Sequence, residues 1–317
     1  MREVSGSAGT GGGLAEGAGC PQGEEGGGDG LVHAARVAKL ADRATTDGLL
    51  MDEALLNVAK WSEITRQSGC PNYEEILRVA YSHFLLRGDV VFDVGAHCGD
   101  HTRSFIDLVG RSGRVICFEP LPRFADLLRK SCASSICSVL ECAVSDKVGT
   151  STFIDVESCP GESGLRERIY NQPNPIKKTI SVLTTTIDAE AENLTRLDYI
   201  KIDIEGGEIG ALLGGLKTLG RLRPVLSIEY GFSSYSKYGH KAGTLYDLLS
   251  ANGYVLADLF GCLIGDRQKW LNVVDRVYWD YFAVPREKAA GWSAKVKRGF
   301  PGSPIRRLIR ALASRRK

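Results

Sequence analysis

The sequence predicts an α/β fold, in which a mostly parallel sheet is covered by helices on both faces. Between residues 89 and 285, short apolar segments alternate with stretches of helical periodicity. Strands of a parallel sheet are buried on both sides, so they are apolar along their whole length. Glycine turns follow several of these segments, as they do where a strand leads into a helix. The alternation and the uniformly apolar strands together define the fold class.

Seven strands are expected, of which five form the parallel part and two close the sheet. The parallel strands are predicted at 90–94, 114–119, 139–144, 199–204 and 224–229, and the closing strands at 254–259 and 277–284. Helices are predicted near 73–86, 101–109, 123–131, 208–219 and 245–251. A long insert at 151–197 separates the third strand from the fourth. It contains two further strand-like runs, 152–156 and 179–183.

Four regions are expected along the chain. Residues 1–30 contain twelve glycines and almost no large apolar side chains, so we expect them to be disordered. Residues 31–88 have apolar positions at helical spacing and predict a helical extension. Residues 89–285 form the main domain. Residues 286–317 are a basic tail, with eleven Lys or Arg side chains and one acid.

The overall composition limits the partners of the chain. A net charge of +2 implies no strong attraction to nucleic acid. No apolar run reaches the roughly 18 residues of a membrane span, and no signal segment is visible, so a cytoplasmic location is expected. The nine cysteines include no CxxC pair, which favours free thiols over a disulfide framework or a metal site.

The basic tail has two interpretations. Apolar residues at 305, 308, 309 and 312 have helical spacing with a basic opposite face, as in helices that lie on a membrane surface. This interpretation predicts peripheral contact with the inner face of the membrane. The alternative, slightly favoured, is a solvated tail without membrane contact.

Three motifs lie at the carboxyl ends of predicted strands, where ligands bind in open α/β sheets. The first is the turn at 93–102, in which Gly95 and Gly99 allow sharp turns and a close approach of the backbone to a ligand. The spacing is G-x-x-x-G, which differs from the G-x-G-x-x-G of a dinucleotide fold. The second is Glu119, which ends the second strand, where its carboxylate can accept two hydrogen bonds from the vicinal hydroxyls of a ribose.

The third motif is the segment 201–208, Lys-Ile-Asp-Ile-Glu-Gly-Gly-Glu. Lys201, Asp203 and Glu205 alternate with isoleucines, so one face of the strand end is charged. Charges on a central strand are costly unless they serve a site or lie at its very end. The functional interpretation is favoured over the alternative, an acidic cluster that stabilises the following helix through its dipole.

Taken together, the ordered motifs resemble the FkbM family of methyltransferases. The likeness covers roughly residues 90 to 284 and includes the segments 91–102, 118–120, 143–146 with Gly149, 184–188, 201–208 and 223–229. The family usually has Gly-Ala-Asn in the first turn, where this chain has Gly95-Ala96-His97. The resemblance implies a class I, Rossmann-like methyltransferase fold that uses S-adenosyl-L-methionine as methyl donor.

The resemblance also implies roles for the residues that bind the methyl donor. Gly95, Ala96 and Gly99 would line its methionine and ribose parts, and Glu119 would hold the ribose hydroxyls. Ala143, with Glu141 or Ser145, would border the adenine. Asp203 would lie near the amino group and the sulfonium. Asp93 and Thr102, in the same first turn, complete the predicted cofactor-binding set.

The family is similar to O-methyltransferases that act on sugars, glycolipids and polyketide-type natural products. A sugar hydroxyl is a poor nucleophile at neutral pH, so a general base assists the transfer. The predicted catalytic residues are Glu205, Glu229 and His97, and we favour Glu229 slightly as the acid that faces the acceptor. His97 and His101 could also pair around a metal, but no third ligand is in register, so no metal is expected.

Two alternatives use the same fold. One is a nucleic-acid methyltransferase, although a basic aromatic surface is missing outside the tail. The other is a module that binds the cofactor without catalysis. Four aromatic residues after the fifth strand either stack on a sugar ring or anchor their loop; they are Phe232, Tyr235, Tyr238 and His240.

Overall fold

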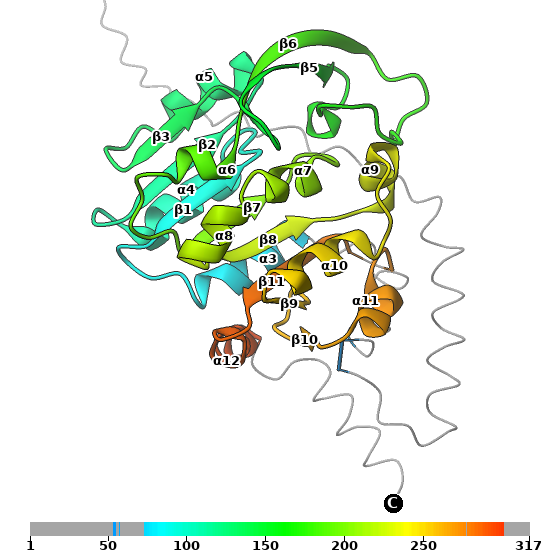
Figure 1. The fold of residues 1–317 in the computed structure, drawn as a ribbon. Coiled ribbons are helices and arrows are strands. Elements are labelled where there is room, and N and C mark those ends of the chain that lie inside the picture. The colour runs from blue at the N-terminus through cyan, green and yellow to red at the C-terminus, as the bar shows by residue number, and fades with distance from the viewer. Residues whose placement is uncertain (1–52, 55–56, 58–72, 277, 301–317) are drawn as a thin grey trace, which may run out of the picture.

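The computed structural model describes residues 53–54, 57, 73–276 and 278–300. Its centre is an eight-stranded sheet with the strand order β10-β9-β11-β8-β7-β1-β2-β3 (Figure 1). The parallel strands are β1 (Val90–Val94), β2 (Arg114–Phe118), β3 (Cys137–Leu140), β7 (Tyr199–Ile202) and β8 (Val225–Glu229). The antiparallel edge consists of β11 (Asp280–Pro285), β9 (Tyr254–Ala257) and β10 (Leu263–Ile264).

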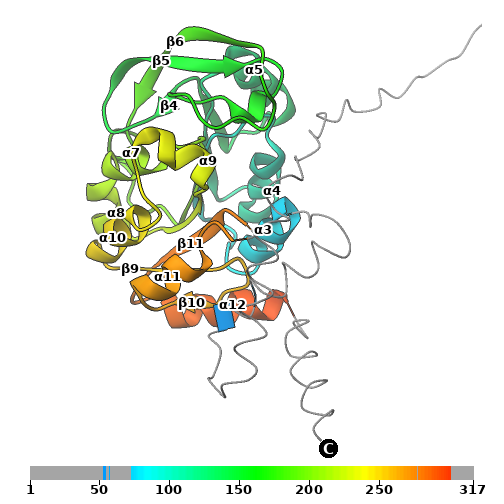
Figure 2. The ribbon, with the colours of Figure 1, turned by 90° about the vertical axis from the view of Figure 1, so that its right-hand side faces the viewer.

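Helices cover both faces of this sheet, as the two perpendicular views show (Figures 1 and 2). On one face lie α3 (Tyr73–Ser82) and α4 (Asp100–Val109), and on the other lie α7 (Glu208–Leu213), α8 (Leu216–Leu222) and α10 (Thr244–Ala251). The remaining helices are α5 (Pro122–Ser131), α6 (Ile187–Glu190), α9 (Phe232–Tyr235), α11 (Arg267–Val273) and α12 (Ala289–Gly299). Two short 3₁₀ helices are η1 (Pro160–Glu162) and η2 (Ser236–Tyr238). The predicted α/β fold is confirmed.

The core forms where β1 and β7 meet the helices of the first face. Both strands are almost fully buried, as expected for the middle of a parallel sheet. Tyr81, Phe105 and Tyr199 are fully buried and meet at ring-centroid distances of 4.8 to 6.1 Å. This rigid centre fixes the carboxyl ends of the strands, from which the site is built.

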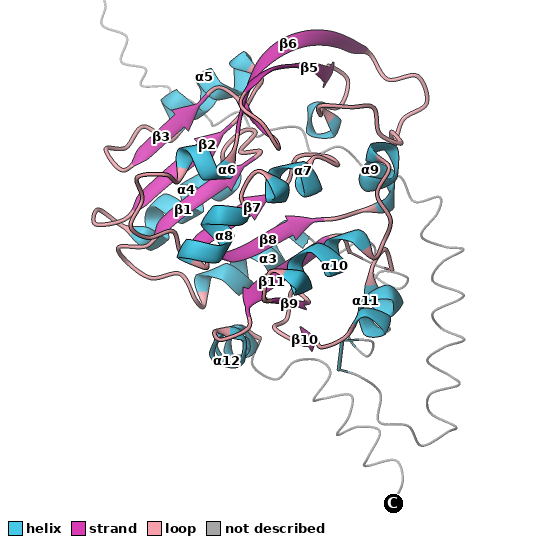
Figure 3. Ribbon diagram, viewed as in Figure 1, coloured by secondary structure: helices cyan, strands magenta, loops and turns pink. Residues whose placement is uncertain are grey.

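A second, three-stranded sheet lies beside the carboxyl end of the main sheet (Figure 3). It consists of β4 (Ala143–Val144), β6 (Lys177–Thr185) and β5 (Gly149–Val156), so the two strand-like runs of the insert are confirmed. The loop between β5 and β6 reaches α9, where the Ile169 amide donates to the Ser233 carbonyl at 2.8 Å. The insert thereby joins the loop that follows β8.

Three predictions of secondary structure were wrong. The predicted strand 139–144 is divided, because β3 pairs with β2 whereas β4 pairs with β6 in the other sheet. The predicted helix 208–219 breaks at Gly214, where a Cβ would lie 2.2 Å from the Ser145 carbonyl oxygen. The main sheet has eight strands and not seven, since the two-residue β10 is too short to give a periodic signal.

Several expectations fall on residues that the structure does not describe. These are the glycine-rich segment 1–30, most of the helical extension before Tyr73, and residues 301–317 of the predicted tail. The prediction of a tail from residue 286 was wrong for its first part, because α12 packs Trp292 and Val296 into the core. Among the described residues, no helix has the length and apolar composition that a membrane crossing needs.

Candidate functional site

The glycine turn after β1 is pressed against the end of β7. Gly95 has a φ of +84°, and the amides of Gly95 and Ala96 both donate to the Phe118 carbonyl, at 3.0 and 3.1 Å. A Cβ at Gly95 would lie 1.9 Å from the Asp203 carbonyl oxygen. Only glycine combines this φ with so close an approach of two backbones. The turn therefore joins the ends of β1, β2 and β7.

The polar residues that flank the turn hold it in place. Asp93 is buried at the end of β1, and the Thr102 hydroxyl on α4 donates to its Oδ2 at 2.6 Å. The second oxygen, Oδ1, is buried and has no hydrogen-bond partner among the described residues. Gly99 begins α4 at a φ of +86°, where a Cβ would lie 2.7 Å from the Leu128 side chain.

Glu119 follows β2 and lies beside the turn, as the sequence predicts. Its side chain accepts the His97 amide at Oε2 and the Leu121 amide at Oε1, at 2.9 and 2.8 Å. The residue is only 4% exposed, and desolvation raises its pKa to about 7. Each carboxylate oxygen has two acceptor positions, so one position on each oxygen remains for a further donor.

His97 occupies the place where the resembling family has asparagine. Its backbone has a φ of +46°, which asparagine and histidine adopt more readily than most residues. The imidazole packs on the Phe124 ring with centroids 4.0 Å apart, and burial lowers its pKa. Its Nε2 is buried without a hydrogen-bond partner among the described residues. The charge of Asp203 opposes the lowering of the His97 pKa. His97 therefore belongs to the glycine turn, and its predicted catalytic role stays a prediction.

Ala143 lies in a small apolar cluster beside Glu119. The cluster comprises Leu121, Ala143, Phe153 and Val182, with Phe124 packed against it. Glu141, predicted as an alternative to Ser145 beside the adenine, pairs with Arg129 at 3.0 Å on the surface. Ser145 donates to Asp146 at 3.0 Å. An apolar wall thus lies next to the Glu119 carboxylate.

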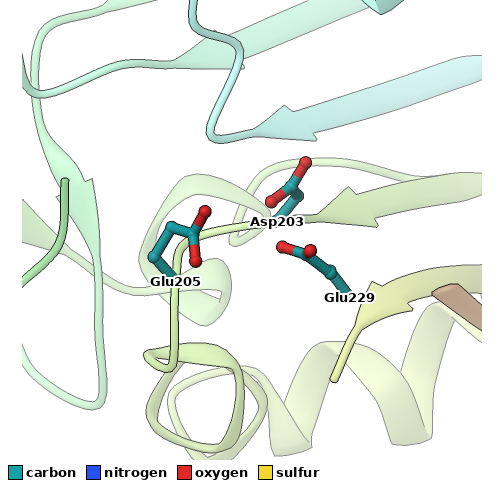
Figure 4. Close-up of side chains that lie close together, drawn as sticks. All are labelled: Asp203, Glu205 and Glu229. Carbon is teal, nitrogen blue, oxygen red and sulfur yellow. The ribbon is translucent and has the colours of Figure 1, made fainter. Parts of the chain in front are cut away.

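Three carboxylates converge at the ends of β7 and β8. Asp203, Glu205 and Glu229 point toward one another, and one oxygen of each lies within 4.8 Å of the others (Figure 4). Asp203 follows β7, Glu205 lies in the next turn with a φ of +59°, and Glu229 ends β8. The three residues are called the acid cluster below. The sequence predicted all three, because carboxyl ends of neighbouring parallel strands share one edge.

Buried cations neutralise part of the acid cluster. The Lys201 ammonium, 5% exposed, lies 2.7 Å from Asp203 Oδ2. It holds the pKa of Asp203 well below its usual range against the opposing effect of desolvation. Desolvation and the charge of Asp203 raise the pKa of Glu229 well above its usual range. Asp203 is therefore ionised at neutral pH, and its charge favours the protonated form of Glu229.

Glu205 has a second cation as partner. The Arg168 guanidinium, carried by the insert, pairs with Glu205 Oε2, and the Ser234 hydroxyl donates to the same oxygen at 3.1 Å. Desolvation raises the pKa of Glu205 to about 8, although Arg168 opposes the shift. Three carboxylates at this spacing have the geometry of a metal site, but Lys201 and Arg168 already supply two positive charges. The prediction that no metal is needed stays a prediction.

The sequence alone missed Arg168, and it left the role of the aromatic residues open. Tyr235 anchors its loop, since it stacks on Tyr230 at 4.3 Å and donates to Asp275 at 2.5 Å. Tyr238 covers the turn after β7, where a Cβ at Gly206 would lie 2.4 Å from its ring. Phe232 is 57% exposed. No local pattern marks Arg168, because its position depends on the path of an irregular loop.

A cavity of about 340 Å³ lies at the opposite edge of the sheet, where β1, β7 and β8 begin. Its lining includes Phe84, Asp198, Trp292 and Lys295, and none of the predicted site residues. The predicted residues instead gather at the carboxyl edge, around the glycine turn and the acid cluster.

The site of this α/β fold has a glycine turn after the first strand, an acid after the second, and carboxylates after the fourth and fifth parallel strands in chain order. The family model for the methyltransferase FkbM domain matches residues 93–256, more than half of the chain. The chain belongs to the FkbM methyltransferase family.

Known proteins with similar sequence or structure add two comparisons. The 2-O-methyltransferase NoeI of Sinorhizobium fredii is 28% identical over 150 residues, which cover 42% of this chain and 60% of that protein. The structure of methyltransferase FkbM from Methylobacillus flagellatus is 16% identical, with a TM-score of 0.43 over 80% of this chain and 58% of that one. The structural match is distant, so the family assignment rests on the family model.

The chain's own donor set fits the methyl donor. The Glu119 oxygens keep acceptor positions for two hydroxyl groups, and the apolar wall at Ala143 suits a flat base. The ionised Asp203 lies against the same turn and suits a positively charged group. Glu119 and Asp203 both border the turn at 95–99.

Proposed function

We propose that this protein transfers the methyl group of S-adenosyl-L-methionine to a hydroxyl oxygen of a sugar-containing acceptor, with Glu205 as general base. The observation that supports the proposal is the acid cluster, which lies beside the cofactor turn and holds one carboxylate poised near neutral pH. A hydroxyl acceptor must lose a proton during the transfer, and Glu205 is the group that accepts it.

In this proposal the residues around the turn hold the cofactor. Gly95, Ala96 and Gly99 line its methionine and ribose parts, and Glu119 accepts hydrogen bonds from the two ribose hydroxyls. Ala143 borders the adenine, and Asp203 faces the amino group and the sulfonium. Asp93 and Thr102 act one layer further away, since their hydrogen bond supports the turn. When bound, the cofactor supplies an activated methyl group, so the protein has to align the acceptor and remove its proton.

We expect cofactor binding to weaken as the pH falls below about 7. Burial raises the pKa of Glu119 to about 7, and the ribose hydroxyls bind its ionised form. Below that pH a proton has to leave before binding, so the affinity falls by up to about tenfold per pH unit. Calorimetric titration with S-adenosylhomocysteine between about pH 6 and 8 measures this slope. In Glu119→Gln, which does not titrate, the slope should disappear; an equal slope in both proteins would contradict the role of Glu119.

The pKa shifts within the acid cluster indicate different roles for Glu229 and Glu205. The raised pKa of Glu229 favours its protonated form, in which it can donate a hydrogen bond to Asp203. Glu205 has a pKa of about 8 and is ionised in part of the molecules at neutral pH. The hypothesis favoured from sequence, that Glu229 faces the acceptor, therefore gives way here to Glu205.

The acceptor is proposed to be a saccharide or a glycolipid. The curated relative is named as a 2-O-methyltransferase, and the acceptor side of the site presents carboxylate, guanidinium and hydroxyl groups from Glu205, Arg168 and Ser234. Such groups suit an acceptor that carries many hydroxyls. This chain spans 60% of the length of that relative, so the choice of sugar and of hydroxyl is a proposal for this protein.

Two isosteric substitutions test the assignment of the base. We expect Glu205→Gln to lower kcat by about 100-fold or more, because no base then takes the proton of the substrate hydroxyl. Glu229→Gln imitates a protonated carboxyl, so its kcat should stay within about tenfold of wild type. The measurement is transfer of labelled methyl to saccharides and glycolipids, with RNA as a further acceptor and with cofactor affinity determined separately. Full activity in Glu205→Gln would remove Glu205 as the base.

A further inference from the structure

Arg168 is the buried cation that the insert brings to the acid cluster. Its side chain is 3% exposed, although it belongs to the irregular loop between β5 and β6. One end of the guanidinium pairs with Glu205, and Nη2 donates to the Ser233 hydroxyl at 2.9 Å. Nε is buried with no partner among the described residues, so one donor remains for an oxygen of a bound molecule.

The loop that carries Arg168 is fixed on both sides of this residue. The Arg166 amide donates to the Tyr238 hydroxyl at 3.0 Å, and the Ile169 amide donates to the Ser233 carbonyl at 2.8 Å. Tyr238 packs in turn against Gly206, next to Glu205. The insert, the loop after β8 and the turn after β7 thus meet at one point. The position of the guanidinium is determined by these contacts and not by a surface rotamer.

Arg168 and Ser234 both bind the same oxygen of Glu205, Oε2. The other carboxylate oxygen of Glu205, Oε1, therefore remains to take the proton of the acceptor hydroxyl. The largest other charges that act on Glu205 are those of Asp203 and Glu208, and Glu229 lies beside it in the acid cluster. All three are acids, and among the described residues Arg168 is the cation that pairs directly with Glu205.

We propose that Arg168 is a positioning residue of the methyl transfer, which favours the ionised form of Glu205 and turns its free oxygen toward the acceptor hydroxyl. This inference rests on the proposed function. In the step itself, the acceptor oxygen forms a bond to the methyl carbon while the carbon–sulfur bond breaks. The sulfur keeps the bonding electron pair and loses its positive charge, and the hydroxyl proton passes to Glu205 Oε1.

The test compares Arg168→Met and Arg168→Lys with Arg166→Met. Arg166 lies in the same loop, is exposed and has its guanidinium 5.4 Å from the Tyr238 ring centroid, so its substitution is the matched control. Carbon-13 NMR titration of the Glu205 carboxyl in the cofactor-free protein reads the effect directly, with Glu205→Gln to assign the signal. The acidic limb of kcat/KM against pH is the second readout.

We expect Arg168→Met to move the Glu205 titration and the acidic limb upward by about one pH unit or more, which corresponds to a roughly tenfold lower rate near neutral pH. Arg168→Lys should restore much of the shift, and Arg166→Met should titrate as wild type. If Arg168→Met does not fold, Ser233→Ala, which releases only Nη2, should give a smaller upward shift. An unmoved titration in the folded variant would overturn the proposal.

The two readouts separate this inference from the proposed function. A wild-type protein that methylates no hydroxyl compound contradicts the proposed function, whatever the titration shows. A rate that falls equally at every pH in Arg168→Met, with an unmoved NMR titration, contradicts only the role of Arg168, because it is the result expected of a purely structural residue.

Discussion

Gly95→Ala should abolish measurable cofactor binding and destabilise the fold. The added Cβ would lie 1.9 Å from the Asp203 carbonyl oxygen, and a backbone atom cannot rotate away as a side chain does. The φ of +84° adds strain of roughly 1–2 kcal/mol for any residue with a Cβ. To relieve the clash, the turn after β1 has to move away from the end of β7, which separates Glu119 from Asp203. Calorimetry with S-adenosylhomocysteine and thermal unfolding measure the two effects.

Gly220→Ala is the matched control for this substitution. Gly220 lies in α8, is exposed, and a Cβ there would meet nothing within 4 Å. Alanine has the higher helix propensity, by roughly 1 kcal/mol, so we expect unchanged cofactor affinity and a slightly higher Tm. If Gly95→Ala bound S-adenosylhomocysteine as tightly as Gly220→Ala does, the turn at 95–99 could not be the cofactor loop.

Glu119→Ala has the second largest expected effect. In the proposed complex, two ribose hydroxyls donate to the Glu119 carboxylate, and the substitution removes both hydrogen bonds. Each such bond to a charged group contributes roughly 1.5–3 kcal/mol. The substitution also leaves the amides of His97 and Leu121 without their acceptors. We expect the affinity for S-adenosylhomocysteine to fall by about 100-fold or more, measured by calorimetric titration at about pH 8, where the wild-type carboxyl is ionised.

The control for Glu119→Ala is an acid outside the site. Glu157 is exposed and pairs with Lys178 at 2.7 Å, so Glu157→Ala removes a charge without touching the cofactor turn. It should leave the affinity unchanged. A similar affinity for Glu119→Ala and Glu157→Ala would show that no ribose lies at the end of β2.

Much of the fold could be predicted because its signals are local. Continuous apolar runs marked the buried strands, and glycines marked the turns. The strand at 139–144 was mispredicted because the switch between sheets at Glu141 and Cys142 depends on which strands pair, which a local pattern does not contain. The break at Gly214 has a similar origin, since the close contact with Ser145 comes from a distant part of the chain.

In the candidate site, too, some residues could be predicted from local signals, whereas others depend on contacts between distant parts of the chain. Glu119, Asp203 and Glu229 could be predicted because each lies at or just beyond the carboxyl end of a parallel strand. The raised pKa of Glu229 could not, since it depends on burial and on the nearby charge of Asp203. Arg168 was missed because a long irregular loop determines where its side chain lies.

In the proposed function, a hydroxyl oxygen receives the methyl group at the acid cluster. The most direct measurement is to incubate the wild-type protein with labelled S-adenosyl-L-methionine and a mixed panel of saccharides, glycolipids and RNA, and to locate the methyl group in the product by NMR. We predict a methyl ether on a saccharide hydroxyl, formed faster as the pH rises toward about 8 and lost in Glu205→Gln. A methyl group on nitrogen, or labelled RNA with unlabelled saccharides, would contradict methyl transfer to a saccharide hydroxyl.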